Sequence, residues 1–128
     1  MKKKVGVVLI AHGSKRSESN REFLELCEEI RAQNSLNFDE ISFAFLEFER
    51  PSLEMALDEM SDKNMDEVYV YPYFLNSGKH VLVDLPQIIS QSKTRHTTMK
   101  IELLTHFGAS LSIPAIVTKE LKNIIMSK

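Results

Sequence analysis

The stretch that most constrains the fold of this chain is Val5-Gly6-Val7-Val8-Leu9-Ile10-Ala11-His12-Gly13-Ser14. A nearly continuous apolar run that stops at a turn signal is typical of a parallel strand buried on both faces of a sheet. Gly13 allows a tight turn, and Ser14 or a following polar residue can cap an emerging helix. His12 is therefore expected at the carboxyl end of a core strand, the edge where open α/β sheets bind their ligands.

Strand and helix patterns alternate along the rest of the chain. Apolar spacing predicts helices over residues 18–32, from Pro51 to Met60, between His80 and Ser92, and over 113–126, and short apolar runs predict strands at 41–46, 68–71 and 101–104. This order predicts an α/β protein of three layers, with helices on both faces of a four-stranded parallel sheet. The first strand is the most apolar and should be interior, which strand order 2-1-3-4 satisfies with right-handed crossovers.

Length and composition narrow the class of protein. The 128 residues predict a single domain over residues 1–128, and the net charge of −2 gives no reason to expect a nucleic-acid partner. The one cysteine, Cys27, excludes a four-cysteine metal or iron–sulfur site within one chain, and its place on an apolar helix face predicts a small buried hydrophobe. No apolar run reaches the roughly 20 residues that span a bilayer, so we expect a cytoplasmic protein without a membrane partner.

Three candidate metal ligands follow three of the predicted strands. His12 ends the first strand, Glu47 ends the second, and His80 lies in the segment after the third. The carboxyl ends of parallel strands meet at one edge of the sheet, so these side chains are expected to converge. Two imidazoles and a carboxylate suit a divalent ion such as iron(II), cobalt(II), nickel(II) or zinc.

Basic and aromatic residues are expected at the same edge. Ser14, Lys15 and Arg16 precede a helix, and Lys79 adjoins His80, a combination that favours a ligand with carboxylates or phosphates over the alternative of a solvated basic loop. The aromatic residues near this edge could wall a flat ligand, or they could belong to the core; they are Phe48, Tyr73, Phe74 and Phe107. His96 is expected in an exposed loop, and His106 at the end of the fourth strand.

Three segments together resemble the signatures of the CbiX/SirB class of sirohydrochlorin chelatases, and the similarity runs from Val5 to the last helix. They are Leu9-Ile10-Ala11-His12-Gly13-Ser14, Ala44-Phe45-Leu46-Glu47 and Gly78-Lys79-His80-Val81-Leu82-Val83-Asp84-Leu85-Pro86. The resemblance implies a lyase that inserts a divalent metal, Co²⁺, Fe²⁺ or Ni²⁺, into an octacarboxylated tetrapyrrole without a nucleotide, in the biosynthesis of cobalamin, siroheme or a related compound. The metal is then a substrate, and no iron–sulfur cluster is expected.

The family's metal-binding and catalytic positions correspond to His12, Glu47 and His80. For substrate binding the candidates are Ser14, Lys15, Arg16, Gly78 and Lys79. The chain departs from the family at two places. Lys79 replaces a second glycine that often precedes the second histidine, and the segment Gly108-Ala109-Ser110 lacks a histidine that many members carry. The first departure concerns how the substrate is bound. The second removes a possible auxiliary protein ligand of the metal.

Three other classes of protein share parts of this pattern. A histidine phosphatase has an arginine before its first histidine, where this chain has Ala11, and a serine hydrolase needs a Gly-x-Ser-x-Gly elbow that is absent from the sequence. A flavin binder would share the fold alone. A carrier that binds metal or tetrapyrrole without turnover stays open as the alternative function. Because one domain would leave a large substrate exposed, we expect a homodimer.

Overall fold

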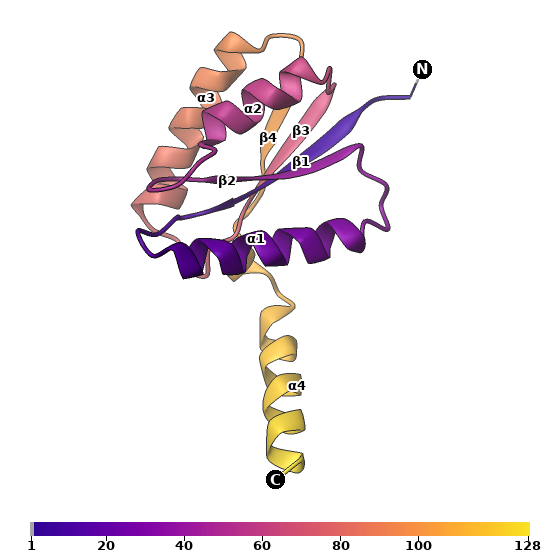
Figure 1. Cartoon of the computed structure of the whole chain (residues 1–128), viewed down its shortest axis with the longest axis vertical. Helices are drawn as coiled ribbons and strands as arrows, with labels where there is room; N and C mark the ends of the chain where they lie inside the picture. The colour runs from indigo at the N-terminus through magenta and orange to yellow at the C-terminus, as the bar shows by residue number, and fades with distance from the viewer. Residues whose placement is uncertain (1) are drawn as a thin grey trace.

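The computed structural model describes residues 2–128, without the side chains of His80 and Leu82. Strands and helices alternate along the chain (Figure 1), in the order β1 (Val5–Ala11), α1 (Ser17–Ala32), β2 (Glu40–Phe45), α2 (Leu53–Asp62), β3 (Glu67–Pro72), η1 (His80–Asp84, a π-helix), α3 (Leu85–Arg95), β4 (Lys100–Leu103), η2 (Phe107–Ala109, a 3₁₀-helix) and α4 (Ile113–Met126). No helix in the described part of the chain is both long and apolar enough to cross a lipid bilayer.

The predicted sheet is confirmed: four parallel strands lie in the order β2-β1-β3-β4. In register, Val8 of β1 lies opposite Ser42 on one side and Val70 on the other. Val8 and Ile10 are completely buried and Leu9 is 6% exposed. The continuous apolar run of β1 therefore reflects its interior position, because an interior parallel strand is covered on both faces.

Each face of the sheet carries its own apolar cluster. On one face, Val8, Val68 and Ile101 pack with the buried residues of α2 and α3, including Leu57 and Ile89. On the other face, a buried cluster joins β1 and β2 to α1 through Leu9, Phe23, Cys27, Ile41 and Phe45, and Tyr71 of β3 packs against it. Figure 1 shows α2 and α3 on one side of the sheet and α1 on the other.

The start of α2 differs from the prediction. Pro51 lies outside the helix, after a cis Arg50–Pro51 peptide bond, and its carbonyl accepts a hydrogen bond of 2.8 Å from the Phe45 backbone N–H at the end of β2. Ser52 is the N-cap, and its Oγ accepts a hydrogen bond of 3.2 Å from the backbone N–H of Met55. The cap therefore comes from a serine side chain that satisfies one of the unpaired amides of the first turn.

The prediction that His96 is exposed in a loop is wrong. His96 follows α3 as its C-cap, its side chain is only 13% exposed, and its Nε2 lies 2.7 Å from Oδ1 of Asp58 in α2. Arg95 Nη2 donates to the other carboxylate oxygen over 2.9 Å. Burial would raise the pKa of Asp58, but the hydrogen bonds with His96 and Arg95 outweigh it, so this pKa is lowered. The three residues join the two helices of one face.

The last helix has the predicted bounds but does not pack on the sheet. Helix α4 projects away from the rest of the domain (Figure 1), and none of its residues is buried. The apolar spacing of Ile113–Met126 predicted a helix with a covered face. In this chain that face is exposed.

Candidate functional site

The turn after β1 is held against the exit of β2. The backbone N–H of Glu47 donates to the carbonyl of His12 over 3.0 Å, and that of Leu46 donates to the carbonyl of Ala11 over 2.9 Å. Gly13 has a φ of +90°, and a Cβ placed there would lie 1.9 Å from the carbonyl oxygen of Glu47. Only glycine fits this turn, because any side chain would push the two segments apart.

This close approach brings two of the three predicted ligands together. His12 Nε2 lies 3.3 Å from Glu47 Oε1, and the two side chains are 45% and 41% exposed. On the other side of the ring, His12 Nδ1 lies 3.1 Å from the carbonyl oxygen of Gly13. A carbonyl can only accept, so a proton on Nδ1 leaves the Nε2 lone pair directed at the carboxylate. Such a pair can hold a cation or share a proton.

The third predicted ligand belongs to a short π-helix. The backbone of His80 begins η1, and its side chain lies outside the described residues. Within the part of the chain whose side chains are described, no group of three or more His, Cys, Asp and Glu residues is arranged to hold a metal ion. π-Helical turns are rare and occur often at functional sites. Whether the His80 imidazole joins the pair stays a prediction.

Asp84 is a neighbour of this pair that the sequence reasoning did not select. Asp84 closes η1 and shares a cavity of about 290 Å³ with Glu47, whose other lining residues are Leu46, Gln87 and Ile88. The signal was present in the sequence, because Asp84 lies inside the third segment, four residues after His80. A second carboxylate therefore lies on the Glu47 side of the site.

Asn20 was also missed, and it fixes the loop that follows His12. This asparagine is only 6% exposed. Its Oδ1 accepts a hydrogen bond of 2.9 Å from the Ser14 backbone N–H, and its Nδ2 donates to the Ser14 carbonyl over 2.8 Å. Its position three residues before Phe23, on the apolar face of α1, was the available signal. Ser14 does not cap α1: the N-cap is Arg16, which makes no side-chain cap bond.

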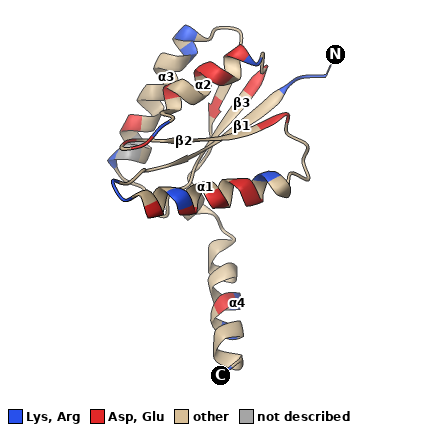
Figure 2. Cartoon of the chain, viewed as in Figure 1, with Lys and Arg blue, Asp and Glu red and all other residues tan. Residues whose placement is uncertain are grey.

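The predicted basic and aromatic residues do gather near this edge. Lys15 Nζ lies 5.4 Å above the ring of Phe48, and Phe48 is 55% exposed. Tyr73 is 42% exposed and stacks between Phe23 and Phe107, with ring centroids 5.8 and 5.5 Å apart. Phe74 lies edge-on to the His12 ring at 6.2 Å. Figure 2 shows the basic loop between β1 and α1 in blue.

A cavity of about 490 Å³ opens beside the His12 turn. Its walls come from this turn, from the flank of α1 and from the ends of neighbouring strands; they include His12, Ser14, Asn20, Leu26 and Tyr73. Gly78 and Lys79 are exposed in the segment before η1. His106 is not the end of β4, as predicted, but lies three residues beyond it and precedes η2. The fourth strand is shorter at this edge than its apolar run indicated.

The family model and the relatives that match this chain point to the same family. The family model described as CbiX matches residues 6–124. A relative in Saccharolobus solfataricus named sirohydrochlorin cobaltochelatase is 31% identical over 103 residues, which are 77% of each chain. One of the same name in Methanococcus maripaludis is 31% identical over 83 residues, which are 65% of this chain and 56% of that protein. This chain thus spans little more than half the length of the Methanococcus relative.

Solved structures share the fold. A CbiX protein from Marinobacter aquaeolei, described as a putative cobalamin biosynthesis protein, matches with a TM-score of 0.82 and 22% identity, over 97% of this chain and 99% of that one. The sirohydrochlorin chelatase SirB from Bacillus subtilis, in complex with cobalt, matches with a TM-score of 0.83 and 21% identity. That match covers 94% of this chain and 51% of the SirB chain.

Proposed function

The chain belongs to the CbiX family, and from that premise we propose that it is a chelatase that inserts a divalent metal into sirohydrochlorin. The metal is a substrate, and cobalt and iron are the first candidates, with nickel as the third. The observation that carries the proposal is the approach of His12 Nε2 to Glu47 Oε1, 3.3 Å apart at the carboxyl edge of the sheet. The insertion needs no nucleotide in this proposal, because the free energy comes from metal–nitrogen bonds.

The proposed metal ligands are His12, Glu47 and His80. A chelatase must orient its ion and then release it to four pyrrole nitrogens, so a site with three or fewer protein ligands suits the task. The partial exposure of His12 and Glu47 leaves one side of the ion open to the macrocycle. An imidazole and a carboxylate together bind iron(II), cobalt(II) and nickel(II) without the tight grip of a thiolate site.

The same groups serve the proton transfers. Two pyrrole protons leave as one divalent metal ion enters, so the charge of the macrocycle is unchanged. The reaction therefore needs groups near the macrocycle that accept the two protons. Neutral histidine and carboxylate are the acceptors within reach, and Asp84 adds a second carboxylate on the Glu47 side. The protons then pass to solvent, to which both His12 and Glu47 are open.

Recognition of the substrate's carboxylates is proposed for the segments beside the pair. Ser14, Lys15 and Arg16 precede α1, and Gly78 and Lys79 precede η1. In this proposal the two groups bind the carboxylates around the rim of the macrocycle. The exposed rings of Phe48 and Tyr73 offer apolar surface to a flat macrocycle. Carboxylate contacts remote from the metal can supply the energy that bends the macrocycle and exposes its nitrogen lone pairs.

The proposed assembly is a cytoplasmic homodimer, in which a second copy helps to enclose the tetrapyrrole. A site at the open edge of one small domain leaves much of a large flat substrate in water. A symmetric dimer is the commonest way to cover such an edge. The alternative function is a carrier that binds metal or tetrapyrrole in the same place without turnover.

Steady-state insertion of cobalt(II) into sirohydrochlorin separates these functions. A chelatase forms many equivalents of product per chain, whereas a carrier stops near one, and the visible absorption of the tetrapyrrole reports both. Glu47→Gln should lower turnover strongly and leave the fold intact. Glu49→Gln is the matched control, because Glu49 is exposed and its Oε1 accepts only a local hydrogen bond, from the Arg50 backbone N–H. Equal turnover in the two variants would remove Glu47 from the site.

A further inference from the structure

Phe48 combines an unfavourable backbone conformation with an exposed side chain. Its φ is +70°, in the left-handed region that a residue with a bulky side chain rarely adopts. The other two residues of the described chain with positive φ, glycine apart, are Asn37 and Asn64, and asparagine tolerates this region. The Phe48 side chain is 55% exposed, so packing of its ring in the core does not explain the strain. A strained residue that the core does not require is a candidate for a functional role.

The segment around Phe48 is fixed at both ends. Just before it, the backbone N–H of Glu47 donates to the His12 carbonyl over 3.0 Å. Just after it, the Pro51 carbonyl accepts a hydrogen bond of 2.8 Å from the Phe45 backbone N–H. Phe48 therefore lies in a turn that backbone hydrogen bonds hold in place, directly after a proposed metal ligand.

The ammonium group of Lys15 lies over the ring of Phe48. Lys15 Nζ is 5.4 Å from the centroid of the ring, within the range of a cation–π interaction. The next basic residue, Arg16, already has a carboxylate partner, because its Nε lies 3.6 Å from Glu18 Oε2. In the part of the chain that the structure describes, Lys15 has no carboxylate partner, and its ammonium contacts the ring instead. The charge of Lys15 is therefore available to a ligand.

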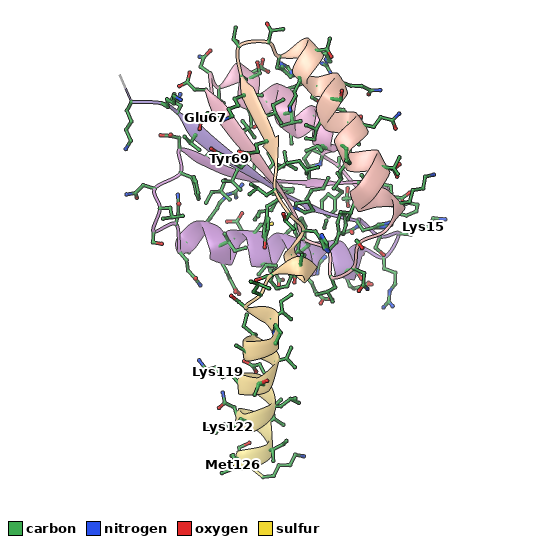
Figure 3. The ribbon with its side chains drawn as sticks, turned by 180° about the vertical axis from the view of Figure 1, so that it is seen from behind. Lys15, Glu67, Tyr69, Lys119, Lys122 and Met126 are labelled. Carbon is green, nitrogen blue, oxygen red and sulfur yellow. The ribbon has the colours of Figure 1, made fainter. Side chains whose placement is uncertain are left out.

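This contact joins the two loops that carry His12 and Glu47. Lys15 follows His12 by three residues, and Phe48 follows Glu47 directly. Figure 3 shows Lys15 on the far side of the domain from Glu67, which begins β3 at the opposite edge of the sheet. A freely moving lysine side chain loses conformational entropy when it binds a ligand, so a ring that restricts it beforehand favours binding.

We propose that Phe48 is a positioning residue, whose ring holds the Lys15 ammonium where it binds a carboxylate of the tetrapyrrole. This role rests on the function proposed above, and the strained backbone of Phe48 then serves substrate binding rather than the fold. The ring occupies one side of the ammonium, and the N–H donors on its other sides are left for a carboxylate. Because Phe48 acts through Lys15 and not on the metal, its loss should weaken substrate binding and leave the rate at saturation nearly unchanged.

The affinity for sirohydrochlorin, titrated by its visible absorption in the absence of metal, is the first part of the test. Phe48→Leu keeps an apolar side chain but removes the ring, and should raise the dissociation constant about 2- to 5-fold, whereas Phe48→Tyr should bind like wild type. Lys15→Met should cost at least as much affinity, and in that background Phe48→Leu should have little further effect. Equal losses in both backgrounds would indicate direct contact of the ring with the tetrapyrrole and would overturn the positioning role.

Stability separates positioning from support of the fold. Phe48→Gly removes the ring but suits a φ of +70°, so urea denaturation should show no loss of stability while the dissociation constant rises as in Phe48→Leu. Asn64→Gly is the matched control, because Asn64 has a φ of +62° in the turn after α2, and it should leave the dissociation constant unchanged. A Phe48→Gly variant that loses stability, or that binds like wild type, contradicts the positioning role.

Initial rates of cobalt insertion keep the positioning role distinct from the proposed function. Phe48→Leu should raise the KM for sirohydrochlorin and leave kcat nearly unchanged. Wild-type protein that binds sirohydrochlorin without turnover, with the expected losses in the variants, contradicts only the proposed insertion. Turnover with a KM that does not respond to Phe48→Leu contradicts only the positioning role. Wild-type protein that does not bind sirohydrochlorin contradicts both.

Discussion

Gly13→Ala should damage the proposed site through a single methyl group. The Gly13 φ of +90° is unfavourable for any residue with a Cβ, at a cost of about 1–2 kcal/mol. The added Cβ would also lie 1.9 Å from the Glu47 carbonyl oxygen, where ordinary contact begins at 3.4 Å, so the two segments must separate by about 1.5 Å. With this displacement, we expect the free energy of unfolding to fall by about 3 kcal/mol.

The same shift should reduce turnover more than stability alone explains. The separation acts on the two segments that hold His12 and Glu47 3.3 Å apart. A displacement of about 1 Å among reacting groups can cost roughly 100-fold in rate, so we expect turnover to fall by about that factor in protein that is still folded. Urea denaturation gives the stability, and initial rates of cobalt insertion at a temperature well below unfolding give the turnover.

Gly78→Ala is the matched control for stability. A Cβ on Gly78 meets no atom within 4 Å, so its free energy of unfolding should stay within about 0.5 kcal/mol of wild type. A Gly13→Ala variant as stable and as active as wild type would show that the turn after β1 does not set the distance between His12 and Glu47.

Two further predictions concern the pairing of α2 with α3 and the buried thiol. Asp58→Asn should lower stability by about 0.5–1 kcal/mol at pH 7, because this carboxylate bonds Arg95 and His96 at a half-exposed position. The pKa of Asp58 is lowered in the folded protein, so its contribution to stability is complete above the unfolded value of about 3.9 and is lost as the pH falls through the lower folded pKa. The difference in stability between the two proteins, measured by urea denaturation, should therefore shrink as the pH falls below about 3.9, and a constant difference would contradict the pairing. Burial raises the pKa of Cys27 to about 11, so a thiol reagent should modify native protein at pH 8 far more slowly than unfolded protein, and equal rates would show that the thiol is not buried. The same raised pKa means that stability should decline as the pH rises above the unfolded value of about 8.5.

The sheet could be predicted from the sequence because its pattern has a single physical cause. A strand such as Val5–Ala11 is apolar throughout only if both faces and both edges are covered, which places β1 between two neighbours. Turn residues and helical spacing then define the remaining elements. The convergence of His12 and Glu47 follows from this topology alone, because both residues follow parallel strands that are neighbours in the sheet.

Other features depend on contacts between segments that are distant in sequence. His96 looked exposed within its polar run, but its partner Asp58 lies on another helix. The start of α2 was missed for a local reason: the Pro51 carbonyl bonds the Phe45 N–H at the end of β2, which leaves the cap to Ser52. The π-helix at His80–Asp84 has no simple apolar period that reveals it.

Helix α4 illustrates the limit of periodicity. The spacing of its apolar residues predicted the bounds Ile113–Met126 correctly. Periodicity records that one face of a helix is apolar, but it does not record which surface that face meets. The contacts just before α4 join segments that are distant in sequence: the backbone N–H of Gly108 in η2 donates to the Phe74 carbonyl over 2.8 Å, and a Cβ on Gly108 would lie 1.6 Å from the carbonyl oxygen of Leu75.

We propose that His12 and His80 act together in metal insertion. The most direct measurement compares initial rates of cobalt(II) and iron(II) insertion into sirohydrochlorin by wild type, His12→Ala, His80→Ala and the double variant, with circular dichroism to verify folding. An ion held by one imidazole is neither oriented nor ready for transfer, so each single substitution should abolish insertion, and the double variant should be little worse than either, as for residues that act as a unit. A folded single variant that inserts metal at the wild-type rate would contradict the two-histidine site.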